Sequence, residues 1–147
     1  MEKKIEIKKK IINHLIVNGK KSTSEKIFIK TAKELQKQSD KQFKKLIQLS
    51  LIHSSPIFKL HTILNKKRKK KNPREIPAFV SNKHRRVSLA IKFILKTTKN
   101  RSSNFFNVLK QEILSNSKFE SGAIDRKNDL QIQALLNKRY FSYYRWN

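Results

Sequence analysis

A run of basic side chains in the middle of the sequence has the clearest chemical meaning. The ten residues from Asn65 to Arg74 carry seven positive charges and no apolar side chain. Clustered lysine and arginine side chains neutralise phosphates and release the counterions that a nucleic acid condenses around itself. The run is therefore a candidate contact for a polyanion. A solvated, disordered basic loop or a localisation signal explains its composition equally well.

A second basic segment, Gly19-Lys20-Lys21-Ser22, invites comparison with a phosphate-binding loop. That motif requires a glycine where His14 stands, a hydroxyl residue directly after its lysine, and a preceding strand. The comparison fails on all three requirements. A short basic turn ahead of a helix can still bind a phosphate through its backbone N–H groups.

The remaining polar residues do not assemble into a catalytic or metal site. The ten acidic residues are dispersed, and the histidines fall on different predicted elements, at His14, His53, His61 and His84. The absence of cysteine excludes disulfides, thiol catalysis and sulfur-ligated zinc. We therefore expect no enzyme, no metal and no cofactor.

The net charge of +26 points to a polyanionic partner. Self-repulsion of this size destabilises a compact chain unless a counter-charged partner is present. Nucleic acid is the first candidate and a membrane surface the second. No apolar run approaches the ~18 residues that a spanning helix needs, so we expect no membrane partner.

Hydrophobic periodicity predicts about six helices and two strands. The first helix is expected at about residues 4–17, with Gly19 as a left-handed cap, and the fourth at about residues 86–98. The second, third and fifth helices are expected to start at the capping box Ser22–Glu25, after Asp40, and after Ser102 or Ser103. Leu130, Ala134 and Leu135 mark a sixth helix. Asn116 to Gly122 is expected to be a loop.

Strands are predicted at Ile57–Leu64 and Glu75–Val80, on either side of the basic run. They form a β-hairpin over approximately residues 57–80, with its basic tip at 65–74. We find no internal repeat and no linker. The expected fold is all-α, a single domain over residues 1–147 with one long projecting β-hairpin between the third and fourth helices.

The predicted fourth helix has an apolar face for the core and a second, basic face. Arg85, Lys92, Lys96 and Lys99 follow one another at intervals of seven, four and three residues. A solvated surface is the simpler interpretation. The neighbouring basic hairpin favours a binding face.

Five aromatic residues occur between Tyr140 and Asn147. Such rings either stack on nucleic-acid bases or fold back onto the core. We expect the second arrangement, because large aromatic rings usually pack inside proteins.

Four segments, taken together, resemble the small-subunit ribosomal protein seven family. They are Asn18–Thr23, Ile76-Pro77, Arg85–Ile94 and the ending Asn137–Trp146. The match is colinear over nearly the whole chain, and the Gly-Lys-Lys turn combined with the Tyr-Arg-Trp ending is distinctive.

The resemblance implies a structural protein of the small ribosomal subunit that binds rRNA directly and nucleates assembly of the head. It implies a hairpin near the exit-site tRNA and the mRNA path, with other head and platform proteins, including ribosomal protein eleven, as partners, and no homo-oligomer. The expected rRNA-binding residues are Lys20, Lys21, Ser22, Lys66, Lys67, Arg68, Lys69, Lys70, Lys71, Arg74, Lys83, Arg85, Arg86, Lys92, Lys96 and Arg145.

Two departures from bacterial members bear on the source. The chain begins almost at its first predicted helix, where bacterial members have a longer basic arm, and its hairpin tip lacks their paired glycines. The first residues show no signal-peptide core and include two glutamates. Abundant lysine, asparagine and isoleucine suggest an A+T-rich genome. We expect a mitochondrial, organelle-encoded protein, ahead of a plastid or bacterial cytoplasmic one.

The rival from another class is a free DNA-binding or chromatin-type protein that places its fourth helix in a major groove. A recognition helix presents asparagine, glutamine or arginine to base edges. Lys92, Lys96 and Lys99 suit phosphates better, so rRNA binding is the preferred interpretation.

Overall fold

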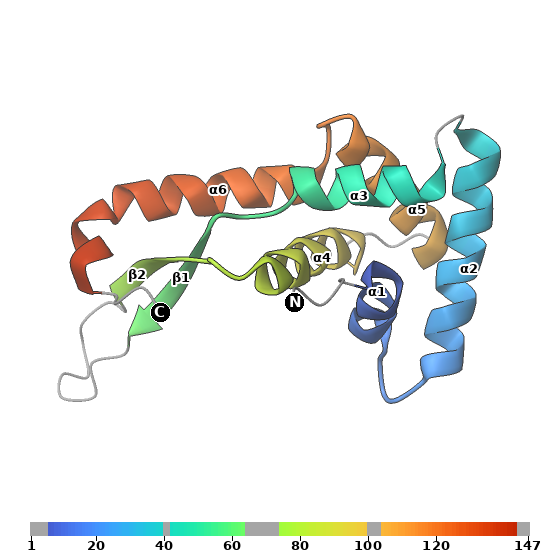
Figure 1. The fold of residues 1–147 in the computed structure, drawn as a ribbon, viewed down its shortest axis with the longest axis horizontal. Coiled ribbons are helices and arrows are strands. Elements are labelled where there is room, and N and C mark those ends of the chain that lie inside the picture. The colour runs from blue at the N-terminus through green and yellow to red at the C-terminus, as the bar shows by residue number, and fades with distance from the viewer. Residues whose placement is uncertain (1–5, 40–41, 64–73, 100–103, 144–147) are drawn as a thin grey trace.

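The computed structural model describes residues 6–39, 42–63, 74–99 and 104–143. Within these ranges the chain forms six α-helices and one antiparallel β-hairpin between the third and fourth helices (Figure 1). The expected combination of a helical bundle and an inserted hairpin is confirmed. The helices are α1 Ile7–Leu15, α2 Lys21–Gln38, α3 Phe43–His53, α4 Lys83–Lys99, α5 Phe105–Ser117 and α6 Gly122–Leu136.

Helix α2 does not begin as the capping box predicts. It starts at Lys21, so Ser22 lies in the first turn, and no side chain caps the helix. The Ser24 hydroxyl donates to the carbonyl of Lys20 over 3.2 Å. Serine hydroxyls can bond back to the preceding helical turn as well as cap a helix. The pattern located the helix but misplaced its first turn.

Two further helices begin after polar residues other than those predicted. Gln42 is the N-cap of α3, and Asn104 is the N-cap of α5. The predicted caps Asp40, Ser102 and Ser103 lie outside the described residues.

The turn between α1 and α2 has a left-handed backbone. Asn18 has a φ of 51° and Gly19 a φ of 72°. The turn closes with hydrogen bonds from the Lys20 N–H to the Val17 carbonyl, at 3.1 Å, and from the Lys21 N–H to the Gly19 carbonyl, at 2.8 Å. Glycine suits this position because a Cβ in left-handed backbone crowds a carbonyl oxygen. The left-handed backbone predicted for Gly19 is confirmed, but its role as a helix cap is not, because α1 already ends at Leu15 with Ile16 as its C-cap.

The hairpin consists of β1, Phe58–Ile63, and β2, Arg74–Phe79. Phe58 lies opposite Phe79 and Ile63 opposite Arg74. Six residues per strand span roughly 20 Å. Figure 1 places the hairpin at the end of the molecule away from α2. The predicted strands overlap both observed ones, while residues 64–73 lie outside the described residues.

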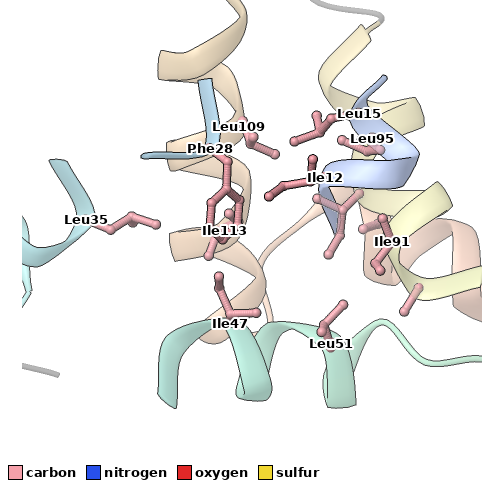
Figure 2. Packing of buried hydrophobic residues seen from close by; sticks show 13 residues of the cluster. Ile12, Leu15, Phe28, Leu35, Ile47, Leu51, Ile91, Leu95, Leu109 and Ile113 are labelled. Atoms are coloured by element: carbon pink, nitrogen blue, oxygen red, sulfur yellow. The ribbon is translucent and has the colours of Figure 1, made fainter. Parts of the chain in front are cut away.

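One apolar cluster receives side chains from all six helices (Figure 2). The predicted inner face of α4 is part of it, since Ala90, Ile91, Ile94 and Leu95 are all buried. Burial of each large apolar side chain contributes about 1.5–3 kcal/mol. The cluster comprises Ile12, Leu15, Phe28, Leu35, Ile47, Leu51, Ala90, Ile91, Ile94, Leu95, Leu109, Ile113 and Ala123.

Two buried polar side chains of α5 join it to its neighbours. The Asn116 side-chain amide donates to the carbonyl and hydroxyl oxygens of Ser50, at 3.0 and 2.9 Å. The Glu112 carboxylate accepts from the backbone N–H of Ala123 over 3.2 Å. Buried polar groups require such partners, because an unpaired one costs free energy. Glu112 is therefore engaged in holding α5 against the start of α6.

After α6 the chain forms a short 3₁₀ helix, η1, Lys138–Tyr143, that returns to the hairpin. The ring of Phe141 lies 5.7 Å from that of Phe58 and 5.8 Å from that of Phe79, centroid to centroid. The predicted folded-back packing is confirmed for Phe141. Its target is the base of the hairpin instead of the helical core, and residues 144–147 lie outside the described part of the chain.

Candidate nucleic-acid interface

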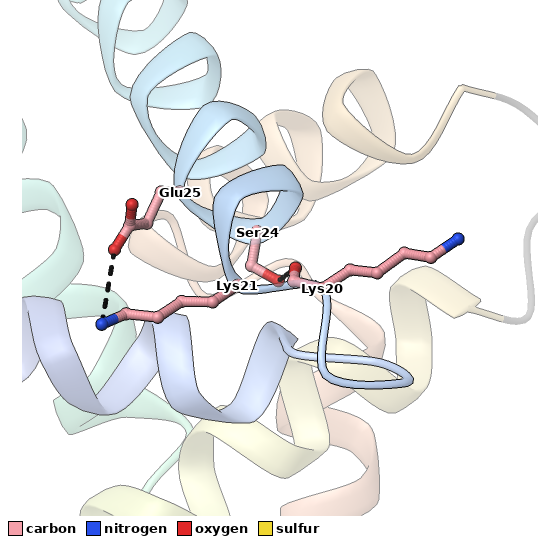
Figure 3. Close-up of polar contacts among 4 residues, drawn as sticks. All are labelled: Lys20, Lys21, Ser24 and Glu25. Atoms are coloured by element: carbon pink, nitrogen blue, oxygen red, sulfur yellow. Dashed lines mark hydrogen bonds and ion pairs between the residues drawn. The ribbon is translucent and has the colours of Figure 1, made fainter.

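The basic turn before α2 presents its two lysines in different directions (Figure 3). Lys21 extends towards Glu25, and the ammonium and carboxylate lie 4.0 Å apart. Lys20 points away from this pair. Both lysines and Ser22 are exposed, so a polyanion can approach them. The pairing with Glu25 leaves Lys20 as the lysine of the turn better placed for an anion.

Helix α4 begins three residues earlier than expected, at Lys83. Asn82 explains the earlier start. Its side-chain oxygen accepts from the His84 N–H over 2.8 Å, and its carbonyl accepts from the N–H groups of Arg85 and Arg86. An asparagine in this position satisfies N–H groups that have no partner within the helix. Lys83 and Arg85 are thereby placed in the exposed first turn.

Arg86 differs from its neighbour Arg85. Its Nε donates to the carbonyl of Val80 over 2.6 Å, and its side chain is half-buried. Val80 follows β2, and its N–H in turn donates to the Ile57 carbonyl over 2.9 Å. The hydrogen bond from Arg86 therefore ties α4 to the base of the hairpin. Within the described residues, the exposed Arg85 forms no hydrogen bond or ion pair with either strand.

The predicted basic face of α4 is exposed along its whole length. Arg85, Lys92, Lys96 and Lys99 all lie on the solvent side of a helix whose other side is buried. At 1.5 Å per residue, the row spans about 21 Å. Because α4 is held by the core, these charges have a fixed spacing.

Helix α1 contributes basic groups that sequence reasoning did not identify. The Lys10 ammonium donates to the carbonyl of His84 in α4. The pKa of His14 is lowered by burial, then by the positive charges of Lys92 and Lys10. Burial also lowers the pKa of Lys10. The part of the His14 shift that comes from Lys92 and Lys10 places both positive charges near this ring, where an anion would be stabilised.

A weak signal for this cluster exists in the sequence. Lys10 and His14 are separated by four residues, which places them on one side of α1. The spacing does not say which helix that side meets. Only the packing of α1 against α4 brings His14 towards Lys92.

The hairpin strands carry a smaller part of the basic surface. Lys59 on β1 is exposed, and it contributes, after burial, to lowering the pKa of His61. Arg74 is the first residue of β2. The predicted contacts Lys66, Lys67, Arg68, Lys69, Lys70, Lys71 and Arg145 lie outside the described residues.

Other kinds of site find no support in the described ranges. No group of three or more histidine or acidic side chains there could hold a metal ion. None of the helices in those ranges is long and apolar enough to cross a bilayer. The described residues do offer an array of exposed cations on a helix held by the core, and such an array can bind phosphates.

Comparisons with known proteins agree with this chemistry. The family model described as ribosomal protein S7p/S5e matches residues 2–138. Small ribosomal subunit protein uS7m of Reclinomonas americana is 28% identical over 138 residues, covering 93% of this chain and 83% of the relative. Protein uS7 of Koribacter versatilis is 30% identical, with 93% and 85% covered, and uS7c of Bigelowiella natans is 24% identical, with 90% and 82% covered. The chain belongs to the ribosomal protein S7p/S5e family.

Proposed function

We propose that this protein is a structural component of the small ribosomal subunit and binds the subunit's rRNA directly. The observation that carries the proposal is the row of exposed cations on α4, a helix whose opposite side is fixed in the core. Folded RNA presents its phosphates at set positions, and a row of charges on a fixed helix can match them with only the side chains left to order. The positive charge gathered by Lys10 and Lys92 near His14 extends this surface onto α1.

The contacts should be made chiefly to the RNA backbone. Double-stranded RNA hides most base edges in a deep and narrow groove, so proteins recognise its shape, phosphates and 2′-hydroxyl groups. Lysine is suited to phosphates as a compact charge with three donors. The proposed contacts on the described residues are Lys20, Lys21, Ser22, Arg74, Lys83, Arg85, Arg86, Lys92 and Lys96, with Lys66–Lys71 and Arg145 added from the sequence.

We further propose that binding nucleates assembly of the subunit head and that the hairpin reaches towards the exit-site tRNA and the mRNA path. Other head and platform proteins, ribosomal protein eleven among them, are the proposed neighbours. We propose a mitochondrial ribosome as the location, supported by the similarity to uS7m and by the A+T-type composition. The chain would act there as one domain and one copy.

Fractionation of cell extract tests the proposal against the DNA-binding alternative. The tagged protein is sedimented through a sucrose gradient, with and without ribonuclease or deoxyribonuclease. We expect it in the small-subunit fraction, released by ribonuclease and unaffected by deoxyribonuclease. Release from chromatin by deoxyribonuclease would favour the DNA-binding alternative. Free protein at the top of an untreated gradient would reject both functions.

A further inference from the structure

The outer face of α6 differs chemically from the rest of this basic protein. Asp125, Asp129, Ile132 and Leu136 follow one another at intervals of four, three and four residues, which places them in one row along the helix. All four are exposed, Ile132 at 57% and Leu136 at 76%. Leu135, 58% exposed, widens the apolar end. We call these five residues the outer row.

The outer row has no evident part in the fold. Helix α6 meets α4, α5 and β1 through another side, on which Ala123, Ile124 and Ala134 are buried. Asp125 lies in the first turn, where a carboxylate interacts favourably with the helix dipole. Asp129 lies a full turn further on. Neither aspartate forms an ion pair within the described part of the chain.

Two occupants fit the outer row poorly. RNA phosphates would be repelled by two unpaired carboxylates. A second copy of α6 would also fit the outer row poorly. If two α6 helices packed antiparallel, Asp125 of one copy would face Leu136 of the other. If they packed parallel, each aspartate would face the same aspartate of the other copy. Like charges and buried, unpaired carboxylates both oppose such contacts.

We propose that the outer row docks a basic amphipathic helix of another protein. Apolar side chains of that helix would cover Ile132, Leu135 and Leu136, and its lysine or arginine side chains would pair with Asp125 and Asp129. The acidic half and the apolar half of the outer row are centred about seven residues apart along α6. The partner's basic and apolar groups should therefore be roughly 10 Å apart. Figure 1 shows α6 running along one edge of the molecule, where a helix could lie alongside it.

The inference rests on the proposed function, because that function supplies the assembled subunit in which the partner is met. The test places a photo-crosslinking amino acid at Asn128, an exposed residue beside the outer row, in the full-length protein. Purified small subunits are irradiated, and the crosslinked product is identified by mass spectrometry. Absence of the protein from subunits would contradict the proposed function, whereas its presence without a protein crosslink would contradict this inference alone.

The expected product joins Asn128 to a protein segment that contains both apolar and Lys or Arg residues. A crosslink to rRNA, to a second copy, or to an acidic segment would overturn the inference. The same reporter at Lys96 on α4 serves as a control for location and should crosslink to rRNA.

Variants of the outer row then test its chemistry. Ile132→Ser with Leu136→Ser should lower the crosslink yield about tenfold or more, since tenfold corresponds to ~1.4 kcal/mol, less than one leucine side chain contributes on burial. Asp125→Lys with Asp129→Lys should lower the yield most at low salt. Ile29→Ser, at an exposed isoleucine of α2, is the matched control and should change nothing. Unchanged yields in both double variants would overturn the inference even if a protein crosslink forms.

Discussion

The Nε of Arg86 donates a hydrogen bond to the carbonyl of Val80 over 2.6 Å, and this contact joins the first turn of α4 to the base of the hairpin. The adjacent Arg85 is exposed. Two consecutive arginines therefore differ: Arg86 holds the fold in addition to being a proposed contact, whereas Arg85 only offers its charge to a partner.

The first prediction separates these two roles. Arg86→Ala should lower the free energy of unfolding by about 1.5–3 kcal/mol, because it removes a charge-assisted hydrogen bond and leaves a carbonyl unpaired. Arg85→Ala should change it by less than about 0.5 kcal/mol yet weaken rRNA binding. Urea denaturation and RNA titration measure the two effects. Equal destabilisation by both substitutions would contradict the assignment.

The second prediction concerns salt. If ~6–10 phosphates are neutralised, affinity for a small-subunit rRNA fragment should fall about a thousandfold or more between ~50 and ~200 mM salt. Replacing Lys92, Lys96 and Lys99 by Gln should make the logarithmic slope shallower by about two to three, close to one unit for each lost contact.

A matched variant removes the same charge elsewhere. Lys26, Lys33 and Lys45 are exposed lysines of α2 and α3 outside the proposed surface. Their replacement by Gln should leave the slope nearly unchanged. Equal effects of the two triple variants would mean that net charge, not the row on α4, governs binding.

The third prediction tests the close approach of α6 to α4. A Cβ on Gly122 would lie 2.7 Å from Cγ2 of Thr97, closer than a Cβ can approach without movement. Gly122→Ala should therefore cost roughly 1–3 kcal/mol of stability. Adding Thr97→Ser removes that methyl group and keeps the hydroxyl, which donates to the Phe93 carbonyl over 2.7 Å. The second substitution should recover much of the loss in thermal denaturation.

Gly19→Ala provides the control for this pair. Gly19 has a φ of +72° but no atom within 4 Å of an added Cβ, so its cost should come from the backbone alone, at about 1–2 kcal/mol. Thr97→Ser should not rescue it. Rescue of both glycine substitutions would show that Thr97→Ser stabilises the protein by another route.

The fourth prediction concerns pH. The folded-state pKa of His14 is lowered by burial and by Lys92 and Lys10, so the unfolded chain binds the proton more tightly. The free energy of unfolding should be highest, as far as His14 is concerned, above the ordinary histidine pKa of about 6.5. It should fall as the pH drops through that value towards the lowered pKa of the folded state. His61 contributes in the same direction, through burial and Lys59.

Denaturation midpoints between about pH 5 and pH 8 measure this dependence, and His14→Gln should flatten it. His61→Gln should flatten it further when the two are combined. A steeper loss of stability at low pH in the His14→Gln variant would contradict the assigned sign.

The sequence predicted the elements well because their signals are local. The periodic apolar residues of α4, and the Asn18-Gly19 pair with its left-handed backbone, depend on neighbours in the chain alone. The exact first residue of each helix was harder to predict. Ser22 can either cap a helix or lie inside its first turn, and Asn82 was overlooked as the residue that begins α4.

The interface was only partly predictable, because part of it depends on tertiary packing. The row from Arg85 to Lys99 follows from helical spacing and is exposed as expected. The engagement of Arg86 with Val80 and the approach of Lys10 to α4 join residues on different elements. No spacing rule links them, so they became visible only in the folded molecule.

The packing of Phe141 against Phe58 and Phe79 also sets an order of events during synthesis. Both strands leave the translating ribosome well before the residue that completes their aromatic anchor. The hairpin can pair with itself and bond to Arg86 of α4 early, but its aromatic anchor is complete only once η1 has emerged. A nascent chain halted before Phe141 would thus carry a hairpin joined to α4 through Arg86 but without the third ring of its aromatic anchor.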